Sequence, residues 1–374
     1  MAQGRIADPA AALTDADKAL LTLAQLRVPL TSRPFEALGQ SLGLTEAEVI
    51  ARLRALKEAG FIRKIGPVME PGALGLASEL VAARVLPAHL DQVGAAVAAW
   101  PEVTHCYARE HEVNLWFAGV AAASEWFESA TAQVAAMEGV QGVWRLPTIR
   151  RFKIAVHFEL APVKEANSRG VEEPKRQESD GRLDSSPIDF STSRPLDSSD
   201  LLNAIQSDLP LSPEPFRELA EHAGVDFGDM MATLTDLLRT GVVRRYGALV
   251  NHRRLGFTAN AMVVMAVPPE RIEAAGARLA ESPHVSHCYQ RPPFPGFPYN
   301  LYAMVHGRDR EECLEVVANL IGAHRCAPSG DDALDWQALF STREYGKSAP
   351  NYARLLVGAS GCAPLRRRAE LEDE

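Results

Sequence analysis

Histidines in two matching motifs are the residues of this sequence best suited to acid–base chemistry. His105 lies in a Thr-His-Cys-Tyr stretch, and His287 lies in a Ser-His-Cys-Tyr stretch. Because imidazole titrates near neutral pH, either side chain could deliver a proton during a reaction. His306 has Val120 as its counterpart in the first half of the chain, which suggests that one half is specialised for catalysis. The alternative for a lone strand histidine is a hydrogen-bonded core position. The other histidines of interest are His111, His157 and His252.

Basic residues offer a second kind of chemistry, the binding of carboxylates. A guanidinium group holds a carboxylate through two parallel hydrogen bonds. Two dibasic pairs, Arg63-Lys64 and Arg244-Arg245, stand at matching positions shortly before a glycine. This duplication favours a binding role, although a solvated surface position is the alternative for any one arginine. The remaining candidates are Arg109, Arg253, Arg254 and Arg291.

These residues belong to an internal repeat that covers most of the chain. Gly60 and Gly241 occupy matching positions 181 residues apart, and each follows a similar helical segment. The register then carries through the two dibasic pairs to the two histidine motifs. The second half gains a short insertion within Pro292–Pro298. Duplication and fusion of one module explain this agreement.

Each module begins with a helical head. Apolar residues at helical spacing predict helices over 16–26, 34–42 and 45–59 in the first copy. Thr45 followed by Glu48 is a capping-box signature, and Gly60 is typical of a helix C-terminus. A short strand is expected over 61–65. This order of elements is the winged helix-turn-helix pattern.

The rest of each module predicts the ferredoxin-like order of strand, helix, strand, strand, helix, strand. The fold class is therefore α+β, with two tandem units that each join a winged head to a βαββαβ body. In the first copy the expected elements are 78–86, 89–100, 103–109, 113–120, 124–137 and 142–149, with further strand over 152–158. In the second copy they are 261–266, 270–280, 285–290, 300–306, 310–321 and 334–340.

The expected domain boundaries follow from this pattern. The segment 162–197 is rich in Ser, Pro and charged residues, so it cannot bury much surface and is expected to be a flexible linker. The boundaries are head one 1–70, body one 71–161, linker 162–197, head two 198–252, body two 253–350 and a C-terminal tail 351–374.

Composition narrows the class of protein. The 374 residues are 47% hydrophobic and 23% charged, with a net charge of −9, which disfavours a general nucleic-acid binder. The five cysteines form no CxxC pair, so neither a disulfide framework nor a zinc site is expected. No stretch is long and apolar enough for a membrane helix, and the N-terminus lacks a signal pattern. A cytoplasmic location is the expectation.

A winged head joined to a βαββαβ body resembles the Lrp/AsnC superfamily of amino-acid-responsive regulators. Within it, three segments of the second repeat resemble the siroheme decarboxylases, and the likeness as a whole covers both repeats and omits only the linker and tails. The likeness is to the fused D–L type of haem d1 synthesis. The segments are Arg244–Gly256, Pro298–Gly307 and Phe340–Tyr345.

The resemblance implies that acetate side chains of siroheme lose carbon dioxide and become methyl groups, towards 12,18-didecarboxysiroheme. No cofactor of the protein's own is implied, because the iron enters with the siroheme, and no protein metal site is expected. The main site would lie in the second repeat near the cleft between the bodies, with His287 and His306 as acid candidates. His105 would serve a second or degenerate site, and His157 could face the cleft. The residues expected to bind substrate are Arg63, Lys64, Arg109, Arg244, Arg245, Tyr246, Arg254, Arg291, Phe297 and Tyr299.

The aromatic residues of the insertion and the function of the protein each have an alternative interpretation. Phe294 and Phe297 in the insertion could lie over the macrocycle, or the segment could be a rigid proline-rich loop. The two repeats are expected to pair within the chain, other haem d1 biosynthesis proteins are possible partners, and neither DNA nor membrane binding is expected. The alternative function is an Lrp/AsnC-type regulator that senses a small ligand, and a weaker one is a siroheme carrier. The regulator is disfavoured because the expected recognition helices begin with acidic residues, which repel phosphate.

Overall fold

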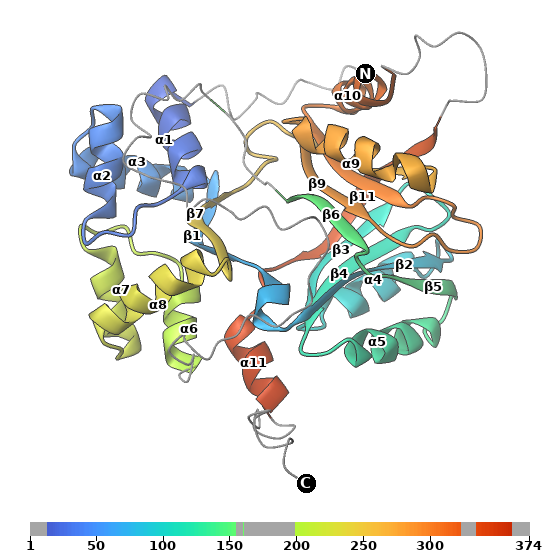
Figure 1. Cartoon of the computed structure of the whole chain (residues 1–374), viewed down its shortest axis with the longest axis horizontal. Helices are drawn as coiled ribbons and strands as arrows, with labels where there is room; N and C mark the ends of the chain where they lie inside the picture. Colours follow the sequence, from blue (N-terminus) through green and yellow to red (C-terminus); the bar gives the residue numbers. More distant parts are fainter. Residues whose placement is uncertain (1–12, 155–159, 161–198, 323–333, 361–374) are drawn as a thin grey trace.

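The computed structural model describes residues 13–154, 160, 199–322 and 334–360. The predicted linker and His157 lie outside these residues. The helical heads gather on one side of the molecule and the two sheet-containing bodies on the other (Figure 1). In the described residues no helix is long and apolar enough to cross a membrane.

Each head is a three-helix unit, as the sequence predicts. Thr45 and Glu48 form the expected capping box, with the Thr45 N–H donating to the Glu48 carboxylate over 2.8 Å. Gly60 has a φ of 77°, a left-handed conformation that favours glycine after a helix. The helices are α1 (Asp15–Leu26), α2 (Pro34–Leu42) and α3 (Glu46–Glu58) in head one, with α6 (Ser199–Gln206), α7 (Pro215–Ala223) and α8 (Phe227–Arg239) in head two.

The wing differs from the expected pattern. The strand after α3, β1 (Ile62–Met69), is longer than predicted and pairs with β7 (Val243–Val250) of the other head. The two strands run antiparallel, and Gly66 lies directly opposite Gly247. A Cβ on Gly247 would lie 2.6 Å from the carbonyl oxygen of Ala24, so only glycine fits there. The heads therefore share one ribbon and one continuous apolar core.

Each body has the predicted ferredoxin-like fold. Numbered along each module, the four strands lie in the order 4-1-3-2 across the sheet. The elements of body one are β2 (Ala77–Val85), α4 (Leu90–Ala98), β3 (Val103–Arg109), β4 (Leu115–Ala121), α5 (Glu125–Ala135) and β5 (Val140–Leu146). Those of body two are β8 (Ala259–Ala266), α9 (Ile272–Glu281), β9 (Val285–Gln290), β10 (Leu301–Gly307), α10 (Arg310–Gly322) and β11 (Asp335–Lys347). Short 3₁₀ turns, Pro71–Leu74 and Pro269–Arg271, link the first strand of each body to its neighbours.

The modules exchange their last strands. The strand β6 (Arg150–Ile154) comes from the first module but pairs with β9 of the second. The strand β11 pairs with β8 as far as Phe340 and then continues, pairing with β3 of the first module from Ser341 to Lys347. We expected this strand to end at Phe340; it extends because the edge of β3 offers unpaired backbone groups. In the described residues, nine body strands thus join in one sheet.

The sheet has one half in each body. Helices cover the outer face of each half, and the inner faces of the two halves pack on each other. Figure 1 shows α4 and α5 on one side, with α9 and α10 on the other. The inner core combines Ala82 and Trp116 of body one with Val264 and Tyr302 of body two. Part of the expected tail is helical: α11 (Tyr352–Ser360) buries Tyr352 against the head core. Its backbone N–H donates to the Gln206 side chain over 3.0 Å.

Candidate active site

Alternation along two strands turns the histidine motifs towards the inner face of the sheet. The Sγ atoms of Cys106 and Cys288 point outward, to backbone carbonyls of α4 and α9. Because neighbouring strand residues face opposite sides, the residues flanking each cysteine face inward. His105 and Tyr107 stack with ring centroids 6.3 Å apart, and the matching rings of His287 and Tyr289 are 6.1 Å apart. The repeat thus places two equivalent histidine–tyrosine pairs inside the molecule.

A serine joins two of the predicted histidines. The Ser286 hydroxyl lies 2.9 Å from Nδ1 of His287 and 2.7 Å from Nε2 of His306. A hydroxyl has one proton to donate, so it donates to one ring and accepts an N–H from the other. The protonation of the two imidazoles is therefore coupled. His306 in turn lies against His252, with ring centroids 5.5 Å apart.

The first module lacks this chain of histidines. The Thr104 hydroxyl lies 2.9 Å from Nδ1 of His105, but it donates to the Ala118 carbonyl over 3.2 Å. Its proton is therefore committed to the backbone. Val120 stands where the second module has His306, and Pro71 stands where it has His252. Among the described residues, the asymmetry seen in the sequence thus appears as a three-histidine chain in the second module and not in the first.

Burial and nearby cations keep these four histidines neutral. Desolvation is the main cause that lowers the pKa of His287 and His252 to about 3, and of His105 and His306 to about 4. Positive charge adds to it, with Lys347 acting on all four rings. His105 and His287 nevertheless keep part of their surface accessible.

The two dibasic pairs divide their roles. Lys64 donates to the Gln206 carbonyl at the end of α6, and Arg245 donates to the Gln25 carbonyl at the end of α1. Each residue thus caps the first helix of the opposite head, where a cation is favourable. Their neighbours face the bodies: Arg63 lowers the pKa of His105, and Arg244 lowers that of His287. The sequence predicted all four as substrate-binding residues, but the structure brings only Arg63 and Arg244 near the histidines.

Arg109 and Arg291 tie the two bodies together. Arg109 of body one donates to the Leu339 carbonyl of body two over 2.8 Å, and Arg291 of body two donates to the Leu146 carbonyl of body one. Both side chains are buried, with 6% and 8% of their surface exposed. In the described structure the Nε of Arg109 has no hydrogen-bond partner. The Nε–H of Arg109 is thus available to donate a hydrogen bond beside the histidines.

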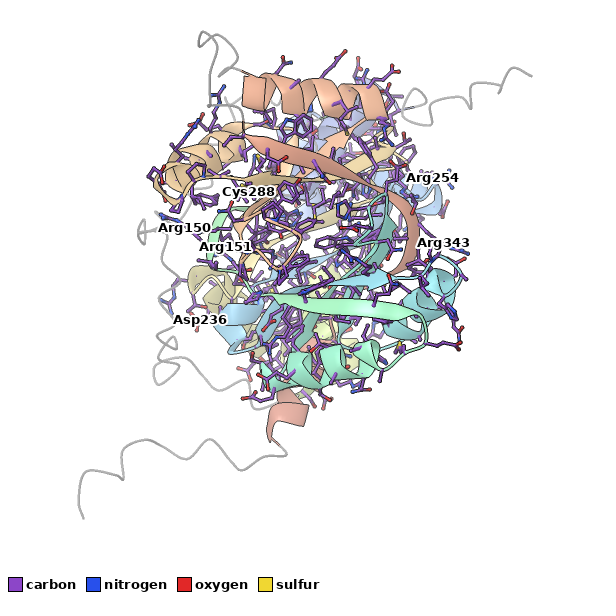
Figure 2. The ribbon with its side chains drawn as sticks, turned by 90° about the vertical axis from the view of Figure 1, so that its right-hand side faces the viewer. Arg150, Arg151, Asp236, Arg254, Cys288 and Arg343 are labelled. Carbon is purple, nitrogen blue, oxygen red and sulfur yellow. The ribbon has the colours of Figure 1, made fainter. Side chains whose placement is uncertain are left out.

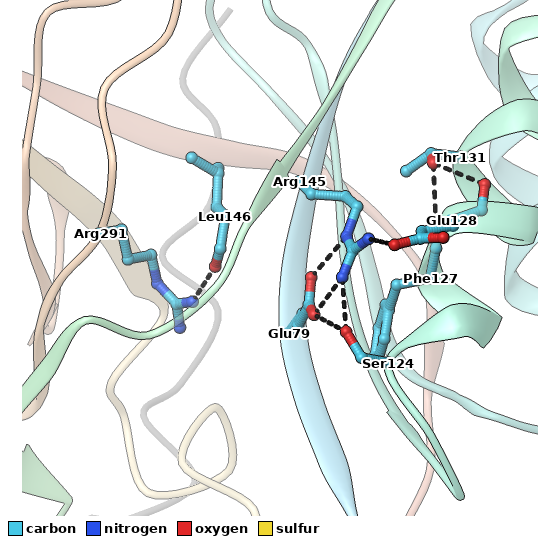
Figure 3. Close-up of polar contacts among 8 residues, drawn as sticks. All are labelled: Glu79, Ser124, Phe127, Glu128, Thr131, Arg145, Leu146 and Arg291. Carbon is cyan, nitrogen blue, oxygen red and sulfur yellow. Dashed lines mark hydrogen bonds and ion pairs between the residues drawn. The ribbon is translucent and has the colours of Figure 1, made fainter. Parts of the chain in front are cut away.

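Figure 3 shows how the partner of Arg291 is held in place. Arg145, which precedes Leu146 in β5, forms two hydrogen bonds with the buried Glu79 carboxylate, at 2.7 and 3.0 Å. Arg145 also contacts Ser124 and Glu128 of body one. This anchored segment fixes the carbonyl that Arg291 uses.

The surroundings of the two histidine motifs differ in charge. Near His287, Arg151 forms an ion pair with Glu70, and Arg244 lies 3.8 Å from the same carboxylate. At the matching position the second head has the neutral Asn251. Near His105 the cations are Arg63, Arg253 and Lys347, with Glu344 as the nearby acid. The His105 side is therefore the more cationic of the two.

The predicted aromatic residues pack inside the protein. Phe297 is 1% exposed and lies between Trp116 of body one and Tyr299, while Phe294 stacks on Trp144 at 4.5 Å. In this arrangement Phe297 packs into the inner core, with Phe294 against it, and Phe297 has no free face for a macrocycle.

Three further predicted residues lie away from the histidines. The Tyr299 hydroxyl donates to Asp335 over 3.4 Å. Tyr246 is buried in the head core beside Phe216. Arg254 is exposed and lies at the rim of the molecule (Figure 2). None of the three is brought next to the His287–Ser286–His306 chain.

Three residues at this site escaped the sequence prediction: Ser286, Lys347 and, as a partner of His306, His252. The sequence carried a signal for Ser286, which differs from its counterpart Thr104. It carried none for Lys347, because only the structure shows that β11 continues past its predicted end and places Lys347 opposite His105. Despite the clustered histidines, the described part of the chain holds no group of three or more His, Cys, Asp or Glu arranged to bind a metal ion.

Comparison with known proteins agrees with this architecture. The AsnC-like ligand binding domain matches residues 73–153 and 254–346, and the siroheme decarboxylase NirDL-like HTH domain matches residues 17–63 and 198–244. The siroheme decarboxylase NirDL subunit of Paracoccus denitrificans is 36% identical over 332 residues, covering 88% of this chain and 95% of the relative. A siroheme decarboxylase of Hydrogenobacter thermophilus is 33% identical over 336 residues, covering 89% and 93%.

Two solved structures share the fold. The crystal structure of the siroheme decarboxylase NirDL has a TM-score of 0.62 at 26% identity and covers 93% of this chain and 99% of that one. The same protein in complex with an iron-uroporphyrin III analogue has a TM-score of 0.62 at 27% identity, with the same coverage.

Proposed function

Because the chain belongs to the siroheme decarboxylase family, we propose that it removes carbon dioxide from acetate side chains of siroheme and leaves methyl groups in their place. The enzyme is a carbon–carbon lyase of the fused two-repeat type. Its product would serve haem d1 biosynthesis, and its place of action would be the cytoplasm. The iron is part of the substrate, and the protein needs no cofactor of its own.

The observation that carries this proposal is the charge inside the molecule. Arg109, Arg244 and Lys347 lie around the inner face, and desolvation lowers the pKa of each of these cations. Arg63 and the four neutral histidines lie beside them. Such an arrangement is costly in the empty protein and becomes favourable when a polyanion binds. Siroheme is a polycarboxylate, so it supplies the missing negative charge.

The reaction itself is balanced by one proton. The bond between the acetate CH₂ and its carboxylate breaks, carbon dioxide leaves, and the macrocycle accepts the electron pair. A proton then forms the new C–H bond, so no oxidant or reductant is consumed. The enzyme's task is to hold the carboxylates and to deliver that proton to the methylene carbon.

We assign proton delivery to His287 and His306. Both rings are neutral in the empty protein, but bound carboxylates oppose the local positive charge and raise a histidine pKa. Ser286 lets a proton pass between the two rings without a change of position. His105 serves the matching position of the first module, and His157 stays a prediction.

We assign carboxylate binding to three of these cations. Arg63 and Arg244 act from the head ribbon, and Arg109 acts from the body through its unpartnered Nε. Arg291 supports the interface between the bodies. The relatives include separate siroheme decarboxylase subunits, such as the NirG subunit of Paracoccus pantotrophus and the NirH subunit of Stutzerimonas stutzeri. A second decarboxylase of that kind is a possible partner for this enzyme.

A DNA-binding regulator is disfavoured. The helix α3 begins with Glu46 and Glu48, and α8 has Asp229 in its first turn. These carboxylates occupy the end of a recognition helix that would approach phosphate and base edges. The heads instead join the two modules through β1 and β7.

The test is anaerobic incubation of the full chain with siroheme, followed by mass spectrometry of the extracted tetrapyrrole. We expect the product to lose the mass of one or two carbon dioxide molecules. Siroheme that stays bound but unchanged would indicate a carrier. Unchanged siroheme together with sequence-selective, salt-dependent binding to promoter DNA would indicate a regulator, and either result would overturn the proposal.

A further inference from the structure

Lys347 lies at the end of the exchanged strand β11, in the part that pairs with body one. In the ladder between β11 and β3, Lys347 lies opposite His105. In the equivalent ladder between β6 and β9, Ile154 lies opposite His287. The two strand pairs are related by the repeat, so the second module has replaced an apolar residue with an amine beside a histidine.

The groups around Lys347 are mostly cationic or neutral. Arg63 of β1 and Arg253 after β7 both lower its pKa, while Glu344 on its own strand raises it. Lys347 itself acts on His105 of β3, His252 after β7, His287 of β9 and His306 of β10. Burial is the largest effect, and the pKa of Lys347 falls to about 8.

A second observation on the same face points to an anionic ligand. Arg109 follows His105 and Tyr107 at alternate positions of β3, and its Nε has no hydrogen-bond partner among the described residues. Burial lowers the pKa of Arg109 to about 10, and the opposing influence comes from the Tyr107 phenol rather than from a carboxylate. Two cations, the buried Arg109 and the more exposed Lys347, thus face the same histidines, and Glu344 is the acid beside Lys347.

We propose that Lys347 binds a carboxylate side chain of the tetrapyrrole beside His105, and so sets the orientation in which the macrocycle enters. This inference rests on the proposed function. The macrocycle carries carboxylates around its rim, and an enzyme that acts on particular acetates must bind it in one orientation. A lysine on one side, with isoleucine at the matching place on the other, gives the site the asymmetry that this choice requires.

The test compares three variants at this position with one control. Lys347→Ile copies the residue of the first module, Lys347→Gln keeps the polar length without the charge, and Lys347→Arg keeps the charge. The control is Lys18→Ile, which removes one positive charge from α1 in the first head. For each protein, siroheme binding is followed by the absorbance of the tetrapyrrole, and KM and kcat are measured without oxygen.

We expect Lys347→Ile and Lys347→Gln to weaken siroheme binding and raise KM about tenfold, the loss of one charge-assisted hydrogen bond. The kcat should change less than KM, and Lys347→Arg should restore the affinity. The product of the Ile and Gln variants should contain a larger share of wrongly decarboxylated isomers. The control should match the wild type.

The pH dependence separates binding from a structural role. Because the pKa of free Lys347 is about 8, siroheme binding at pH 9 should take up a proton and be weaker than at pH 7. Both effects should vanish in Lys347→Gln. If the Gln variant folds and binds as the wild type does at both pH values, the inference is wrong while the proposed function stands. If the wild type binds siroheme but never decarboxylates it, the proposed function fails instead.

Discussion

His306 and His287 share one hydroxyl, that of Ser286, at 2.7 and 2.9 Å. The shared hydroxyl couples the two rings, so a proton lost by one can be replaced through the other. In the first module the matching hydroxyl of Thr104 donates to a backbone carbonyl instead. The two modules thus differ in one hydrogen bond. His105 keeps its proton in place, whereas His287 and His306 can pass a proton between them.

Replacing Ser286 with alanine should therefore slow turnover more than it weakens binding. We expect kcat to fall about tenfold, within the range for loss of one group in a proton-transfer step. Thr104→Ala is the matched control and should leave kcat nearly unchanged. Anaerobic steady-state kinetics measure both. Equal losses in the two variants would show that the hydroxyls only support packing.

Stability should fall on acidification because of the buried histidines. Their folded pKa values of about 3 to 4 lie below the reference value of 6.5, so below pH 6.5 the unfolded state binds more protons. The free energy of unfolding is unaffected by these histidines above pH 6.5. It decreases as the pH falls towards 4, by up to about 1.4 kcal/mol per pH unit for each histidine. Denaturant unfolding of the wild type and of His306→Val across this range measures the difference. Parallel pH curves would contradict the assignment.

The two members of each dibasic pair should have different effects, one on the stability of the fold and the other on siroheme binding. Lys64→Met and Arg245→Met remove helix caps, so we expect each to lower the free energy of unfolding by about 1 kcal/mol. Siroheme affinity should hardly change. Arg63→Met and Arg244→Met should do the reverse. Denaturant unfolding and siroheme titration, run on all four variants, would refute this division if both members of a pair behaved alike.

Charge near His105 should control affinity. Asn251→Glu gives the second head the acid that Glu70 provides in the first, and it should weaken siroheme binding about tenfold by competing for the cations. Asn251→Gln is the control for size and should bind normally. Titrations at low and moderate salt measure this effect. An unchanged affinity in the glutamate variant would exclude a substrate carboxylate from this region.

Much of the fold was predictable because its signals are local. The helix spacing, the Thr45 capping box and the βαββαβ order all appear within short stretches of sequence. The pairing of β1 with β7 and the exchange of β6 and β11 were not predictable in this way. They join segments from different modules, and a strand carries no local mark of its partner.

The site was predictable only in outline. The repeat identified His105 and His287, and the asymmetry at Val120 identified His306. The dibasic pairs were overestimated, because adjacent strand residues face opposite sides and only one of each pair can face the bodies. Phe297 was assigned to the substrate because the sequence could not show that Trp116 of the other body would cover it.

The most direct test of the account is the product formed by His287→Gln and His306→Val, with binding measured separately from turnover. Each variant should bind siroheme within a few-fold of the wild type, because neutral rings contribute little to holding a polyanion. Each should release far less carbon dioxide, with siroheme recovered largely unchanged by mass spectrometry. If both variants decarboxylate siroheme at the rate of the wild type, proton delivery through these two histidines is contradicted.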